Sequence, residues 1–149
     1  SDKKFDLIIM SGHTFQTLTS DSDIQKTFET VKLHLDEKGV FAFETRNPVV
    51  DWIEKWSSNG EKELNLLGNK VRIATDAFIT KDELLSFKHH YRFVDQEIVS
   101  ESTLRFASEE KIKDLLSTEN IEVVSVYGNW DKEPLTVGSP EMIFITKLK

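Results

Sequence analysis

Two short apolar runs separated by a helical pattern open the chain, and this order is what most constrains its fold. Phe5 to Met10 (FDLIIM) is rich in branched residues and ends at Ser11-Gly12, which predicts a strand buried on both faces, as in a parallel sheet. Val40 to Glu44 (VFAFE) has the same character. Two buried strands joined by a helix predict a right-handed parallel crossover.

The intervening helix has clear signals at both ends. Ser20 and Asp23 have the spacing of a capping box, and Lys38-Gly39 is a typical C-terminal stop. Apolar residues between these ends recur at intervals of three or four and form one stripe: Ile24, Phe28, Val31 and Leu35. The stripe predicts a helix packed against the two strands.

The pattern changes in the middle of the chain. Asn47-Pro48 is expected to start a short helix that carries Trp52 and Trp56, followed by a loop at 57–60. Three segments with two-residue alternation then predict a three-stranded antiparallel meander, inserted at about 69–106 with a turn at Asp95-Gln96. The remaining expected elements are a helix capped by Ser108, a strand at 121–127, a polar loop at 128–140 and a strand at 142–146. The fold class is α/β, in one domain over residues 1–149.

Composition excludes several functions. The chain has 19 Lys and Arg against 26 Asp and Glu, a net charge of −7, which argues against nucleic acid as a partner. It has no cysteine, which excludes disulfides, thiolate zinc sites and cysteine nucleophiles and fits a cytoplasmic location. No apolar run approaches the roughly 20 residues that span a bilayer, and no signal peptide opens the chain, so no membrane partner is expected.

Common cofactor and catalytic motifs are absent. No two of the six glycines are closer than eight residues, so the sequence has neither a dinucleotide fingerprint nor a phosphate loop. His89 and His90 are adjacent on a predicted strand and point to opposite faces, and no HExxH spacing occurs, so no metal site is expected. The serine-hydrolase pattern GxSxG is also missing.

Two loops follow the carboxyl ends of the predicted parallel strands, where ligands bind in open α/β sheets. They are Ser11 to Leu18 (SGHTFQTL) and Thr45 to Pro48 (TRNP). Both mix polar groups with an aromatic residue or a proline, as functional loops often do. The alternative is that His13 and Gln16 only cap backbone groups while Arg46 pairs with a surface acid.

The order of these segments carries a family resemblance. FDLIIMSGHTFQTL, a capped helix ending in LDEKG, and VFAFETRNP together resemble the second half of class I S-adenosylmethionine-dependent methyltransferases, from the fourth strand to the fifth. The C-terminal stretch VYGNWDKEPLTVGSPEMIFITKLK is similar to the closing hairpin of that family. The chain departs from the family mildly at Glu37-Lys38-Gly39, where a proline and two glycines are usual.

The resemblance implies the C-terminal half of a Rossmann-like methyltransferase sheet with the antiparallel insertion. The glycine-rich loop and the acidic residues that hold S-adenosylmethionine precede the fourth strand in this family and would lie before Ser1. The chain is therefore expected to be a partial methyltransferase domain, inactive alone. Its parent would transfer a methyl group from S-adenosylmethionine to a small-molecule acceptor.

The resemblance also implies site residues. His13 is the candidate catalytic base, and Ser11 and Gly12 are candidate cofactor contacts. The candidate substrate contacts come from the two strand-end loops, the insertion and the last loop: Phe15, Gln16, Arg46, Asn47, His89, Tyr91 and Trp130.

An alternative function remains open from the sequence. The insertion could make the chain a non-catalytic interaction or dimerisation module, with Phe87, Tyr91 and Phe93 facing another chain. A glycine-rich turn after a strand, encoded before Ser1, would favour the enzyme. Because a half-sheet leaves an uncovered edge, a homodimer is expected in either case.

Overall fold

The computed structural model describes residues 3–57, 60–66 and 68–149, which form two compact units. The first, here called the αβ unit, combines Ser1–Val50 with Arg105–Lys149. The second, here called the antiparallel unit, is Asp51–Leu104. Each is described by itself.

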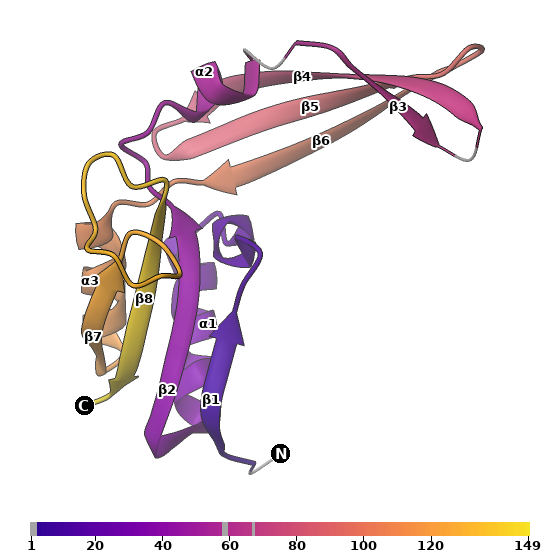
Figure 1. Ribbon diagram of the computed structural model, residues 1–149. Coiled ribbons are helices and arrows are strands. Elements are labelled where there is room, and N and C mark those ends of the chain that lie inside the picture. The colour runs from indigo at the N-terminus through magenta and orange to yellow at the C-terminus, as the bar shows by residue number, and fades with distance from the viewer. Residues whose placement is uncertain (1–2, 58–59, 67) are drawn as a thin grey trace. The chain divides into compact units, whose positions relative to one another are not determined.

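A four-stranded mixed sheet forms the αβ unit, in the order β1-β2-β8-β7 (Figure 1). Its strands are β1 (Phe5–Met10), β2 (Leu35–Arg46), β7 (Ile121–Tyr127) and β8 (Glu141–Leu148). β1 and β2 are parallel, and β8 runs antiparallel to both β2 and β7. The predicted parallel pair and the closing hairpin are therefore confirmed.

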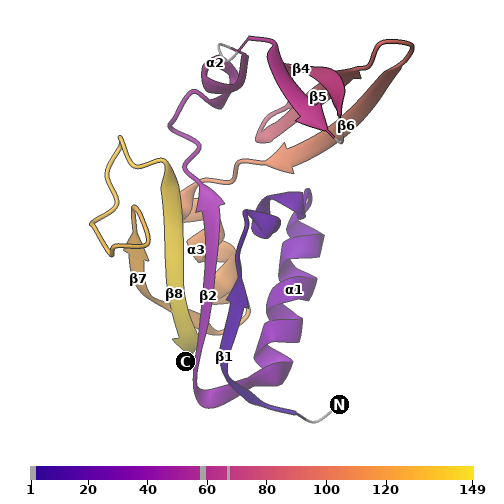
Figure 2. The same cartoon turned by 45° about the vertical axis from the view of Figure 1, so that its right-hand side comes forward.

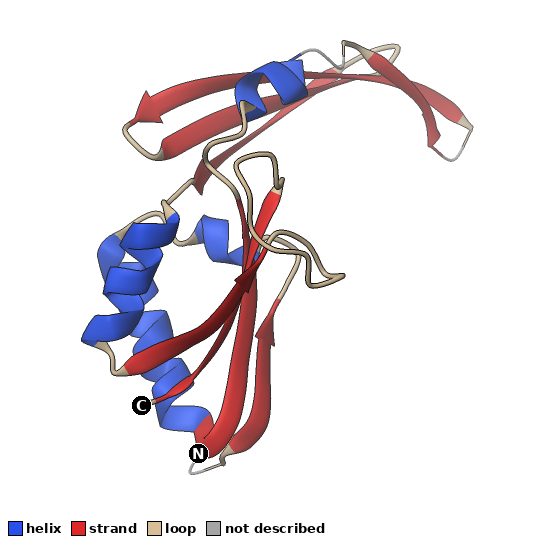
Figure 3. Ribbon diagram, turned by 60° about the vertical axis from the view of Figure 1, so that its left-hand side comes forward, coloured by secondary structure: helices blue, strands red, loops and turns tan. Residues whose placement is uncertain are grey.

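Helices α1 (Asp21–His34) and α3 (Glu109–Thr118) cover one face of this sheet (Figure 3). The predicted caps form: the Ser20 hydroxyl accepts the amide of Asp23, and the Ser108 hydroxyl accepts the amide of Lys111. Stacked aromatic rings fill the space beneath the helices, and the buried rings are Phe15, Phe28, Phe41, Phe43 and Phe144. This core lies under the ends of β1 and β2 that carry the predicted functional loops.

Two expectations for the αβ unit are wrong. α1 ends at His34, and Leu35 already pairs with Phe5, so Lys38-Gly39 is not the helix stop. Gly39 is instead required by a close approach, because a Cβ there would lie 2.8 Å from both Leu35 Cδ1 and the Phe5 carbonyl oxygen. β1 is not buried on both faces either, because Leu7 and Ile9 point away from the helices and are 54% and 56% exposed.

The antiparallel unit contains α2 (Trp52–Ser57) and a four-stranded sheet in the order β3-β4-β5-β6 (Figure 2). The strands are β3 (Lys62–Leu66), β4 (Asn69–Lys81), β5 (Leu84–Arg92) and β6 (Glu97–Arg105). The meander therefore has four strands rather than the predicted three. β3 is short and exposed along its whole length, and its apolar alternation is limited to Leu64 and Leu66.

The boundaries around α2 also differ from expectation. Asn47-Pro48 does not begin the helix, which starts at Trp52, because the capping residue is Asp51, whose carboxylate accepts the amide of Glu54 at 2.8 Å. The predicted loop at 57–60 falls partly outside the described residues. The turn at Asp95-Gln96 is confirmed, with the Phe93 amide donating to the Gln96 carbonyl. Among the helices that the structure describes, none is long and apolar enough to span a membrane.

Candidate functional site

The loop after β1 turns sharply before the 3-10 helix η1 (Thr14–Thr17). Gly12 and His13 both have left-handed backbone conformations, with φ of 70° and 58°. Glycine adopts this region freely, whereas it is strained by roughly 1 kcal/mol or more for a residue with a Cβ. Ser11 and Gly12 are exposed at the strand end. The strained His13 is therefore held in place by contacts beyond the loop.

One such contact is a hydrogen-bonding partner for the His13 ring. Its Nε2 lies 3.1 Å from Glu141 Oε1, at the start of β8, and the two side chains are 25% and 24% exposed. An ionised carboxylate only accepts hydrogen bonds, so Nε2 carries the hydrogen in this pair. In the neutral ring the lone pair then resides on Nδ1, which becomes the atom able to accept a proton.

The second contact is with Glu44, near the end of β2. The carboxylate of Glu44 is 4% exposed, and its Oε1 accepts the backbone amide of His13 at 3.0 Å. Its Oε2 accepts the indole Nε1–H of Trp130 at 2.7 Å. Trp130 belongs to the loop between β7 and β8 and is 53% exposed. One buried carboxylate thus joins two loops at the same end of the sheet.

Arg46 and Gln16 form a second pair at this edge. Arg46 Nη1 donates to Gln16 Oε1 at 2.7 Å, and Gln16 Nε2 donates to the carbonyl of Arg105 at 3.1 Å. Burial lowers the pKa of Arg46 from its ordinary value, while the negative charges of Glu141 and Glu44 oppose that effect. Arg46 lies directly opposite Glu141 in the β2–β8 pairing. The guanidinium is therefore held in charged form at the end of β2.

Two of the predicted substrate contacts have structural roles. Phe15 is only 2% exposed, with its ring 4.7 Å from that of Phe43. Asn47 is 4% exposed, and its amide donates to the Ser139 carbonyl at 2.9 Å and to the Thr136 carbonyl at 3.4 Å. Phe15 thus supports the His13 loop from within the core, and Asn47 fastens the β7–β8 loop to the end of β2.

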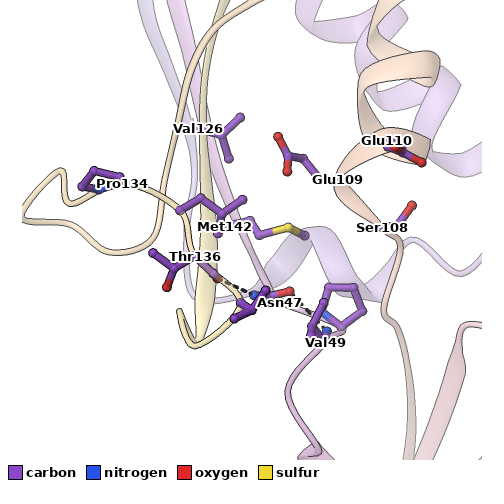
Figure 4. A pocket seen from close by; sticks show the side chains of 12 residues that line it. Asn47, Val49, Ser108, Glu109, Glu110, Val126, Pro134, Thr136 and Met142 are labelled. Atoms are coloured by element: carbon purple, nitrogen blue, oxygen red, sulfur yellow. Dashed lines mark hydrogen bonds between the residues drawn. The ribbon is translucent and has the colours of Figure 1, made fainter.

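A hollow of about 590 Å³ lies beside Asn47 (Figure 4). It is bounded by the segment after β2, the start of α3, the end of β7 and the β7–β8 loop. Met142 faces this hollow and shares the helix-covered face of the sheet with Phe144, because side chains two apart on a strand point the same way. Glu44, Arg46 and Glu141 lie on the opposite face. The hollow is therefore separate from the His13 cluster.

The remaining predicted residues, His89 and Tyr91, lie in the antiparallel unit on one face of β5. Their ring centroids are 6.1 Å apart, and His89 lies 4.9 Å from Phe87, which contacts Trp56 at 5.4 Å. His89 Nδ1 is hydrogen-bonded to the Thr75 hydroxyl at 2.8 Å. The predicted aromatic row therefore forms as a continuous strip.

Glu44 and Glu141 are the members of the cluster that sequence reasoning missed. Glu44 left one signal, as the single acid at the end of an otherwise apolar strand, VFAFE. Glu141 left none, since it meets His13 across 128 residues of chain. No group of three or more side chains suited to holding a metal ion occurs in the part of the chain that the structure describes.

Comparisons with known proteins place the fold. No protein-family model and no curated protein sequence matches the chain. Among solved structures, an S-adenosylmethionine-dependent methyltransferase from Clostridium acetobutylicum matches 99% of the chain with a TM-score of 0.72 and 21% identity. The CcbJ methyltransferase from Streptomyces caelestis matches all of it with a TM-score of 0.75 and 13% identity. CalS10 from Micromonospora echinaspora, an amino pentose methyltransferase, matches 99% of the chain with a TM-score of 0.70 and 13% identity.

The chain spans only 60%, 63% and 59% of the length of these three proteins. Its fold is that of S-adenosylmethionine-dependent methyltransferases over this portion, as the sequence resemblance implies for a C-terminal part. The likeness extends through both the αβ unit and the antiparallel insertion, because it covers essentially the whole chain.

Proposed function

We propose that this chain is the acceptor-side portion of an S-adenosylmethionine-dependent methyltransferase that acts on a small molecule. The observation that carries the proposal is the match of the whole chain to such enzymes, with the His13–Glu141 pair at the carboxyl ends of the parallel strands. Ligands of open α/β sheets bind at these ends. The net charge of −7 also favours a small metabolite over a nucleic acid.

The chain supplies few of the groups that a nucleoside cofactor needs. Its glycines are at least eight residues apart, and a Cβ at Gly12 would meet no atom within 4 Å, so the loop after β1 forms no tight backbone cradle. Both oxygens of Glu44 are already engaged. We therefore assign only a peripheral contact to Ser11 and Gly12, and the main cofactor site to residues beyond this chain.

The bound cofactor supplies a methyl group on a sulfonium. The chain's own residues would then position the acceptor and take up its proton. His13 Nδ1 is the proton acceptor for an N–H or O–H group, and the exposed ring of Trp130 is a flat surface against which the acceptor packs. The charged Arg46, held by Gln16, orients a polar or anionic group of the acceptor. Most of the rate enhancement would come from positioning of the reacting groups.

Sugar and amino-sugar acceptors are the class that we favour. CalS10 is described as an amino pentose methyltransferase, and the similar structure KedS8 as a sugar N-methyltransferase. An amine or hydroxyl acceptor of this kind presents the proton that His13 would accept. In the antiparallel unit, His89 and Tyr91 provide an aromatic strip of the kind that packs against sugar rings.

The test uses the full-length protein. Calorimetric titration with S-adenosylmethionine should show binding by the full-length protein. The 149-residue chain alone should bind the cofactor weakly or not at all. His13→Ala and Arg46→Ala should each lower turnover, because one removes the proton acceptor and the other an orienting charge. Unchanged kinetics in both variants would remove these residues from the site, and absence of cofactor binding by the full-length protein would refute the enzyme.

A homodimer is the second part of the proposal. On β1, the terminal strand in the order of its sheet, Leu7 and Ile9 are more than half exposed, and such edges promote association. Light scattering should give a mass above 17.2 kDa for the chain. Replacing both side chains with lysine should restore the monomer mass. A monomer mass for the unsubstituted 149-residue chain would contradict the proposal.

A further inference from the structure

Glu44 is a buried acidic residue of the αβ unit. It is 4% exposed near the end of the internal strand β2, with Ala42 buried beside it on β2 and Ile143 opposite it on β8. A carboxylate in such surroundings is unfavourable unless hydrogen bonds and an opposite charge compensate it. The Arg46 guanidinium, two residues along the same strand face, provides the opposite charge.

The two hydrogen bonds of Glu44 go to segments far apart in the sequence. One is donated by the amide of His13, 31 residues away, and the other by the indole of Trp130, 86 residues away. Each oxygen of the carboxylate accepts a hydrogen bond from one loop. A neutral apolar side chain at this position would accept neither bond and would hold neither loop.

Each bond constrains a feature of the candidate site. The bond to the His13 amide opposes the strain of its left-handed backbone, at a φ of 58°. The bond to the Trp130 indole orients a ring that is otherwise 53% exposed. Through these contacts one buried group sets the place of both the proton acceptor and the packing surface.

We propose that Glu44 is the positioning residue of the acceptor site. It holds His13 and Trp130 in place without touching the acceptor. This inference rests on the proposed methyltransferase function. It assigns to Glu44 an effect on turnover that is exerted through His13. Loss of such positioning lowers rates by about tenfold to 100-fold.

The substitution Glu44→Gln tests the structural part on the chain itself. Glutamine replaces one of the two carboxylate oxygens with an NH2 donor, so one of the two N–H groups loses the oxygen to which it donates in the wild type. In ¹H–¹⁵N spectra, the His13 amide resonance, the Trp130 indole resonance or both should move toward the position of a solvated N–H. The matched control is Glu122→Gln, an exposed strand glutamate paired with Lys147 at 3.4 Å. If neither resonance moves more than in the control, the proposal is overturned.

The functional part is a double-mutant cycle in the full-length enzyme. Glu44→Gln should lower kcat by about tenfold or more with a smaller change in KM. In a His13→Ala background it should lower kcat little further, because Glu44 acts through His13. A general loss of folding would instead lower the activity of both backgrounds equally, and that additive result would overturn the proposal.

If Glu44→Gln does not fold, Trp130→Phe tests the same proposal from the other side of the Glu44–Trp130 hydrogen bond. It removes the indole donor but keeps an aromatic ring, and it should raise KM for the acceptor while leaving the His13 amide bonded to Glu44. An unchanged KM would contradict the role of Glu44 in placing the ring. If the wild-type enzyme transfers no methyl group, the proposed function fails, while the spectra still decide whether Glu44 holds the two loops.

Discussion

The Phe43→Ala substitution tests whether the aromatic core supports the candidate site. Phe43 is fully buried, and its ring is stacked on Phe144 at 4.9 Å with an interplanar angle of 4°. It also lies 4.7 Å from Phe15, 4.9 Å from Phe41 and 5.9 Å from Phe28. Removal of its ring therefore leaves a cavity bordered by four other rings.

The expected loss can be worked from these contacts. A buried phenylalanine replaced by alanine typically costs about 3–5 kcal/mol. Aromatic pairs contribute roughly 0.5–1.5 kcal/mol each beyond burial, and Phe43 takes part in several, so we expect about 4–5 kcal/mol. Total stabilities are about 5–15 kcal/mol, so the variant should be near its unfolding threshold at 25 °C. Phe43→Leu, which loses only a few carbons, should cost about 2 kcal/mol and remain folded.

Urea unfolding measures the effect. Trp130 should be the only reporter, in a background where the other two of the three tryptophans are phenylalanine, so that the signal comes from the αβ unit. The control is Phe5→Ala on β1 of the same unit, where the ring is 48% exposed and about 1 kcal/mol or less is expected. A loss below about 2 kcal/mol for Phe43→Ala, or one equal to the control, would refute the packed ring cluster.

Three further variants address charge, close packing and capping. The pKa of Asp21 is lowered by its hydrogen bonds to Lys111 and Arg105. Because Asp21 is partly exposed, Asp21→Asn should lower the free energy of unfolding by only about 0.5–1 kcal/mol at pH 7. Urea midpoints of the two proteins should converge as the pH falls below about 4, since the charged form stabilises only above its folded pKa. Gly39→Ala should destabilise by about 1–3 kcal/mol, since its Cβ has no room. Ser108→Ala should lose about 1 kcal/mol with the α3 cap.

The parts of the fold that were predictable have local causes. The Ser20 and Ser108 caps and the apolar stripes of α1 and α3 are encoded within a few residues, and these elements form as expected. The end of α1 was not predictable, because Lys38-Gly39 resembles a helix stop while the pairing of Leu35 with Phe5 ends the helix earlier. Tertiary pairing there overrides a local signal. β3 was missed because pairing with β4, rather than a buried apolar face, makes it a strand: Leu64 and Leu66 alternate there but are 48% and 49% exposed.

The candidate site divides in the same way. The loops were located correctly at the carboxyl ends of β1 and β2 because sheet topology alone determines that position. Which side chains meet there depends on the antiparallel return of β8, which brings Glu141 opposite Arg46 and within reach of His13. Glu44 is the exception that a sequence could reveal. An acid within a buried strand must have partners, and in this chain its partners are the two loops that the proposed chemistry needs.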